Sequence, residues 1–109
     1  MLRTYTLTQL TAAGTVTSSA PIYGGLLAAH VANNSAGTVT LQTQHSPQMI
    51  LLSGTAAGTA WYHPRVQLCD VGGTAITSHY DVWPVADYVQ VVVNAAGTVS
   101  VTLLVTQPA

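Results

Sequence analysis

The sequence predicts an all-β fold, namely a single-domain antiparallel β-sandwich or jelly roll of about eight to nine short strands spanning residues 1–109. Sixteen Thr and fourteen Val residues, both suited to half-buried strands, dominate a chain of 109 residues. Strong helix formers other than Ala and Leu are scarce, and Ala often stands beside Gly. Turn signals recur every 8–15 residues or so, which is the spacing expected of short strands.

A recurring phrase supplies the clearest turns. It is Ala-Ala-Gly-Thr-Val at 12–16 and 95–99 and Ser-Ala-Gly-Thr-Val at 35–39, with looser copies at 56–60 and 72–75. An Asn precedes two copies, and Asn followed three positions later by Gly suits a type I turn in a hairpin. The unequal spacing of the copies argues against a solenoid.

These turns divide the chain into strand-like segments, and each full copy of the phrase is expected to close a hairpin. We expect hairpins of 3–10 with 15–19, 26–32 with 38–44, and 88–93 with 98–106. Shorter strands are expected at 49–52, 59–65, 66–69 and 74–78, and a loop at 80–87. In the last segment Val99, Val101, Leu103 and Val105 alternate with polar residues, which predicts one buried face.

Only five residues carry a formal charge, namely Arg3, Arg65, Asp70, Asp81 and Asp87. Two cations cannot neutralise many phosphates, so we expect no nucleic-acid partner. No apolar run approaches the roughly 20 residues of a membrane helix, and the first ten residues do not resemble a signal peptide. We therefore expect no membrane partner. A nearly uncharged surface repels its own copies weakly, which favours self-association or a place in a larger assembly.

Chemistry-bearing residues form no recognisable motif. The four His residues lack metal-ligand spacing, although His63, Cys69, Asp70 and His79 are candidates for a site assembled in three dimensions. Cys69 has no neighbouring Lys to lower its pKa and is expected to be a small core residue. No nucleophile elbow or paired catalytic carboxylates are recognisable. We expect no enzyme activity, no cofactor and no bound metal.

The segment Trp61-Tyr62-His63-Pro64-Arg65 is the most distinctive. Trp, Tyr and Arg dominate interface hot spots, so Trp61, Tyr62, Arg65 and Trp83 are the candidate interface residues. The alternative is that the aromatic rings fill the core and that Arg65 pairs with one of the Asp residues, since an unpaired buried charge is costly.

Several features in order resemble tailed-phage capsid decoration (cement) proteins. They are Tyr23-Gly24 before an early strand, the Trp61–Arg65 segment, the Asp70–Gly73 turn and a valine-rich close at 89–105. The resemblance covers roughly residues 22–105 and departs from the family in having no Lys near the last strands. It implies an oligomeric β-sandwich on the outer capsid surface of a virion, bound to the major capsid protein, and no catalytic residues.

The sequence thus favours a virion structural protein that self-associates as a dimer or trimer and stabilises a phage head. One alternative is a tail, neck or fibre-base component. Another is a small carbohydrate-binding module that uses Trp61, Tyr62 or Trp83 as a sugar platform.

Overall fold

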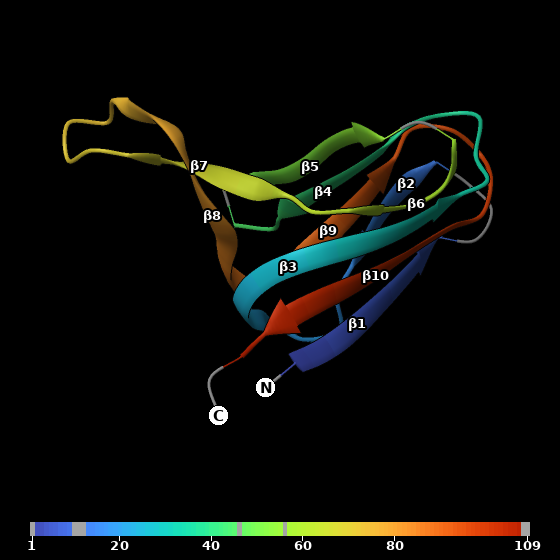
Figure 1. Cartoon of the computed structure of the whole chain (residues 1–109). Helices are drawn as coiled ribbons and strands as arrows, with labels where there is room; N and C mark the ends of the chain where they lie inside the picture. The colour runs from blue at the N-terminus through green and yellow to red at the C-terminus, as the bar shows by residue number, and fades with distance from the viewer. Residues whose placement is uncertain (1, 10–12, 46, 56, 108–109) are drawn as a thin grey trace.

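A computed structural model describes residues 2–9, 13–45, 47–55 and 57–107, and it confirms the all-β fold class (Figure 1). The described residues contain ten antiparallel strands and no helix, and therefore no helix long and apolar enough to cross a membrane. The strands are β1 (Leu2–Gln9), β2 (Gly14–Thr17), β3 (Ile22–Asn33), β4 (Val39–Thr43), β5 (Ile50–Thr55), β6 (Gly58–Tyr62), β7 (Arg65–Cys69), β8 (Ala75–Asp87), β9 (Val89–Val93) and β10 (Val99–Thr106).

The strands form two sheets that pack face to face. The large sheet has the order β1-β10-β3-β8-β7, and β6 also pairs with β3; the small sheet has the order β2-β9-β4-β5. β3 serves two partners along one edge, because residues 29–33 pair with β6 and residues 22–26 pair with β8. This division lets β7 and the outer half of β8 extend beyond the sandwich.

The core lies between the inner faces of the two sheets. On β10 the residues Val99, Val101, Leu103 and Val105 are all buried, as their alternation predicts. The facing strands of the small sheet contribute buried Val39, Leu41, Val89, Val91 and Val93. Beside β10 in the large sheet, β3 contributes buried Leu26, Ala29 and Val31. Each large aliphatic side chain contributes about 1.5–3 kcal/mol by leaving water, so this β-branched core is the main source of stability.

The three predicted hairpins are wrong, because the flanking strands of each turn lie in different sheets. β3 and β10 belong to the large sheet, whereas their sequence neighbours β4 and β9 belong to the small one. β1 pairs with β10 and β2 pairs with β9, so these two strands do not form a hairpin either. Residues 10–12 of the first turn lie outside the described residues. The other two turns are arches that cross between the sheets.

The arches at 34–38 and 94–98 pack against each other at one end of the sandwich (Figure 1). Asn34 N donates to Thr98 O at 3.0 Å, and Asn94 N donates to Thr38 O at 3.4 Å. Asn94 Oδ1 also accepts a hydrogen bond from Thr38 N at 2.7 Å. The two copies of the phrase thus bind each other reciprocally. β3 pairs with β10 in the large sheet, and β4 pairs with β9 in the small sheet. The two strands that precede and follow each arch are therefore paired with the strands that flank the other arch.

A buried polar residue anchors the first arch. Asn33 is 1% exposed, and its Oδ1 accepts hydrogen bonds from Ser35 N at 2.9 Å and Ser35 Oγ at 2.6 Å. Its Nδ2 donates to Gly37 O at 3.1 Å and to Thr55 O at 3.4 Å. One side chain therefore satisfies backbone groups of the arch and of β5, which makes its burial tolerable.

Two further expectations are corrected. The described strands number ten rather than eight to nine, in part because buried Pro64 separates β6 from β7 and these strands pair with different neighbours. The segment 80–87 is not a loop but part of β8, in which Pro84 lies opposite Gly25. Tertiary pairing with β3 holds this segment extended although it contains a proline.

Candidate interaction surface

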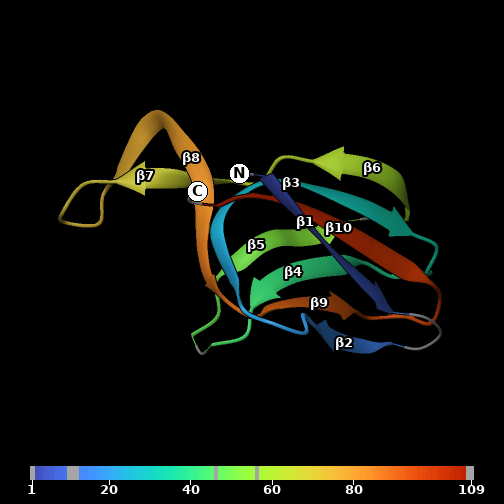
Figure 2. The same cartoon turned by 90° about the horizontal axis from the view of Figure 1, so that it is seen from below.

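The most exposed part of the fold is a projecting arm, defined here as residues 65–82, which comprises β7, the turn at 70–74 and the outer half of β8. Figures 1 and 2 show it leaving the sandwich at the end opposite the arches. It contributes to an elongated shape with extents of 43, 30 and 26 Å. Within the described strands, β7 pairs with β8 alone.

Side chains of the arm present apolar surface to solvent. Leu68 is 40% exposed, Ile76 38%, Tyr80 59% and Val71 fully exposed. The arm also carries Cys69, which is a free and exposed thiol and not the core residue that its type predicts. Exposed large apolar side chains on a protruding element are a common feature of contact sites.

The tip is built as a stable turn. Asp70 Oδ1 accepts hydrogen bonds from Gly72 N at 2.9 Å and Thr74 N at 3.0 Å, and Gly73 N donates to Asp70 O at 3.0 Å. Gly73 has a φ of +86°, which a residue without a side chain adopts at little cost. These bonds hold the neighbouring Val71 outward at the end of the arm.

An irregularity bends β8 away from β7. Gln67 lies opposite Tyr80 and Cys69 lies opposite Ala75, so four residues of β8 span the distance covered by Leu68 alone on β7. Among the extra residues Ser78 has a φ of +64°, an uncommon value outside glycine. Figure 2 shows β8 arching away here while β7 continues straight. The bulge therefore lies on β8, and β7 has a regular edge.

Arg65 stands at the base of the arm, but its partners are not those considered from the sequence. Its Nη1 donates to Leu27 O and to Pro64 O, both at 2.8 Å. Within the described residues no ion pair joins it to Asp70, Asp81 or Asp87. The Arg65 side chain is exposed, so its charge stays hydrated while it ties β7 to the backbone of β3.

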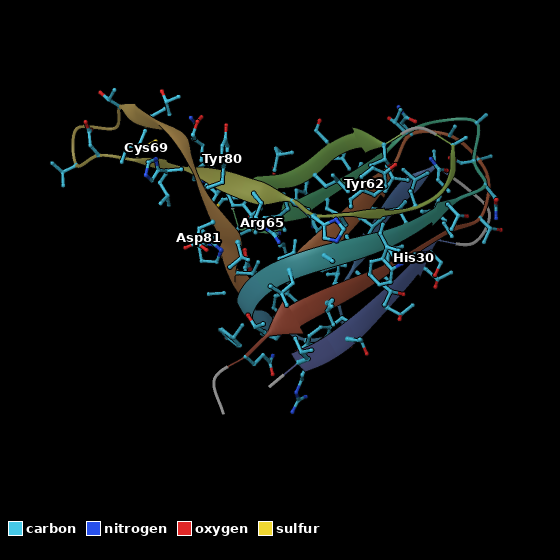
Figure 3. The ribbon with its side chains drawn as sticks, in the orientation of Figure 1. His30, Tyr62, Arg65, Cys69, Tyr80 and Asp81 are labelled. Atoms are coloured by element: carbon cyan, nitrogen blue, oxygen red, sulfur yellow. The ribbon has the colours of Figure 1, made fainter. Side chains whose placement is uncertain are left out.

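The three aromatic candidates separate into different environments. Trp61 on β6 is 55% exposed, and its ring meets His30 edge to face at a centroid distance of 4.9 Å. Tyr62 and Trp83 are half-buried and pack against the core. The structure thus places Trp61 on the outer face of the large sheet and gives Tyr62 and Trp83 a largely structural role. Figure 3 shows His30 and Tyr62 over the sandwich, with Cys69 and Tyr80 on the arm.

The metal candidates do not assemble. In the described part of the chain, no group of three or more His, Cys, Asp or Glu side chains could hold a metal ion. The carboxylates instead bind backbone amides: Asp87 accepts hydrogen bonds from His45 N at 2.6 Å and Tyr88 N at 2.7 Å, and Asp81 from Val82 N at 2.8 Å. Their role is local backbone support.

Two surface hollows adjoin β8. The larger, of about 410 Å³, is lined by Thr43, His45, Pro47, Met49, Pro84, Val85, Ala86 and Asp87. The smaller, of about 280 Å³, lies at the base of the arm and is lined by Gly24, Gly25, Val66, Leu68, Asp81, Val82 and Pro84. Both are mainly apolar, and Asp87, the acid in the larger one, already accepts two hydrogen bonds. They offer apolar contact and little polar chemistry.

Sequence reasoning missed the arm's apolar residues. Val71 was the available signal, because it stands inside an Asp-Val-Gly-Gly turn where a polar residue is usual. Comparisons with protein families, with curated proteins and with solved structures find no match to this chain.

Proposed function

We propose that the chain is a structural subunit of a virion, of the capsid decoration kind that its sequence resembles, and that it binds the major capsid protein lattice on the outer surface of a phage head. The observation that carries this proposal is the arm, which extends apolar side chains beyond the sandwich. A rigid sandwich can sit on one subunit while its arm reaches another. Repetition over a lattice then turns weak individual contacts into high occupancy.

The surface chemistry supports the same role. The chain contains no Lys and no Glu, and Thr, Ser and Gln are its main polar residues. Copies that lie side by side on a shell therefore meet little electrostatic repulsion.

The test is binding of the purified chain to empty heads of a tailed phage that encodes it, measured by co-sedimentation. We expect saturable binding in a fixed ratio to the major capsid protein. Val71→Asp at the arm tip should weaken binding about tenfold or more by placing a charge in an apolar contact. Thr77→Asp, on the same arm, is the matched control. Absence of binding to heads, with recovery of the chain in purified tails, would assign it to the tail, neck or fibre base instead.

Exposure of Trp61 favours a second candidate function, carbohydrate binding. Its ring is held by His30 and is open to solvent, as a sugar platform requires. A glycan array tests this directly: binding abolished by Trp61→Ala and kept by Tyr23→Ala, a residue with a similar 57% exposure, would support it. If the chain binds no glycan on the array, the carbohydrate-binding function is excluded.

A further inference from the structure

The free edge of β7 is an unprotected template for strand addition. β7 is a terminal strand of the large sheet, so alternate backbone N–H and C=O groups along it point away from β8. Natural edge strands are usually protected by Lys, by an internal proline or by a bulge. The sequence Arg-Val-Gln-Leu-Cys contains no Lys and no proline, and the bulge lies on β8.

The arm also lacks the support that a stable sheet needs. A two-stranded hairpin is marginally stable in water, and three or more strands with an apolar face are required for independent stability. In this arm every residue from 68 to 81 is exposed. Added strands would supply the missing support.

We infer that two copies of the chain join their arms by antiparallel pairing of β7 with β7 across a twofold axis at Gln67. This interface rests on the proposed assembly function and deepens it by naming the surface through which copies meet. The resulting four-stranded arm would have the order β8-β7-β7-β8.

The sequence of β7 selects this register. Pairing centred on Gln67 places Val66 of each copy opposite Leu68 of the other, so four apolar side chains adjoin on one face. A centre at Val66 would place Leu68 opposite Pro64. A centre at Leu68 would place Val66 opposite Asp70. Of these three centres, only Gln67 places each apolar residue of β7 opposite an apolar residue of β7 itself, because Pro64 and Asp70 lie outside the strand and Pro64 has no N–H to donate.

Charge supports the same register and the choice of a second copy as the occupant. Arg65 of one copy lies opposite Cys69 of the other, so the next residue, Asp70, is one position from the cation at each end. The nearest charge to each Arg65 across the axis is therefore of opposite sign, whereas a centre at Arg65 would bring two cations together. A strip complementary to itself about a twofold axis is suited to an identical partner.

Disulfide trapping tests the register. In a Cys69→Ser background, Gln67→Cys places two thiols at the axis, where opposite Cα atoms are about 4.5–5.5 Å apart and within disulfide range. Copper–phenanthroline oxidation should convert most of this variant to a covalent dimer. Native Cys69 should not cross-link, because its two copies would lie about 13 Å apart along the strands. Thr77→Cys in the same Cys69→Ser background should also fail to form a covalent dimer, because residue 77 lies on β8, one strand further from the axis.

Sedimentation provides a second measurement that does not depend on cysteine. Leu68→Lys should raise the dimer dissociation constant about tenfold or more, because it removes the apolar pair and adds like charges near the axis. Ile76→Lys is the matched control, since Ile76 is 38% exposed and Leu68 40%, but it lies on β8.

Equal cross-linking at all three positions, or a wild-type monomer at micromolar concentration, would overturn the interface. Binding to heads without cross-linking at position 67 would overturn the interface alone. Cross-linking at position 67 without binding to heads would support the interface and remove the head-binding function.

Discussion

Replacing Gly97 by alanine tests whether the contact between the two arches stabilises the sandwich. Gly97 has a φ of +142°, which residues with a side chain rarely adopt. A Cβ at this position would lie 2.5 Å from Ser35 Cα and 2.8 Å from Asn34 O. Both atoms belong to the backbone of the other arch, so relief requires the arches to move apart.

The expected loss has two parts. Forcing alanine into this backbone conformation costs about 1–3 kcal/mol. Overpacking against a neighbouring backbone costs about 1–3 kcal/mol more. A combined loss of about 4 kcal/mol is a large fraction of the roughly 5–15 kcal/mol that stabilises a typical domain.

Gly58→Ala is the matched control, because Gly58 has a φ of +122° and a Cβ added there would have no atom within 4 Å. The loss of stability in Gly58→Ala therefore measures the cost of the backbone conformation without any contribution from overpacking. Urea unfolding followed by far-UV circular dichroism measures both variants, with an unchanged slope as the check on two-state behaviour. Equal losses for the two variants would refute the claim that contact between the arches contributes to stability.

Four further substitutions test other parts of the fold. Asn33→Ala should cost about 2–4 kcal/mol of unfolding free energy in urea, because it leaves buried arch groups without partners; a loss below 1 kcal/mol would contradict the anchoring role. Trp83→Ala should cost about 3 kcal/mol and Trp61→Ala less than about 1 kcal/mol in the same assay, because only Trp83 packs against the core; equal costs would contradict the assigned environments. Asp70→Ala should leave global stability within about 1 kcal/mol but speed hydrogen exchange at the amides that its carboxylate binds, since the arm opens locally; unchanged exchange would show that the turn does not need the carboxylate.

The buried faces of the strands were predictable from sequence, whereas their partners were not. Alternation along 99–105 predicts which residues of β10 are buried, because side chains alternate strictly between the faces of a strand. It does not specify whether the preceding strand lies beside β10 or across the core. Val89, Val91 and Val93 would be buried in either arrangement.

Turn chemistry misled the prediction for a related reason. The phrase after Asn34 and Asn94 satisfies the local demands of a tight turn whether or not the next strand returns to the same sheet. An arch between the sheets, in place of a hairpin within one sheet, is favoured by contacts between the two copies, such as the hydrogen bond from Thr38 N to Asn94 Oδ1. That contact joins residues far apart in sequence. The informative signal was the repetition itself, with apolar strands on both sides of each copy.

The candidate site was predicted only in part, because hot-spot composition identifies residue types and not their exposure. Trp61 is on the surface, but Tyr62, its neighbour along the strand, points to the opposite face and packs against the core. Leu68 and Ile76 are ordinary strand residues by sequence. They are exposed because the arm leaves the sandwich, which follows from the division of the β3 edge between β6 and β8.

Scarcity of charge acquires a specific meaning on the arm. Lys on edge strands commonly prevents unwanted strand pairing, and this chain has none. A protein that must remain monomeric would need another form of protection at β7, whose edge is regular and whose side chains include exposed Leu68. The charged residues of β7 and of the turn that follows it, Arg65 and Asp70, are of opposite sign and stand at opposite ends of the strand. In antiparallel self-pairing centred on Gln67, the nearest charge of the other copy to each Arg65 is an Asp70, whereas in a parallel arrangement in register like charges adjoin. The few charges that the chain retains therefore favour one orientation of pairing instead of preventing it.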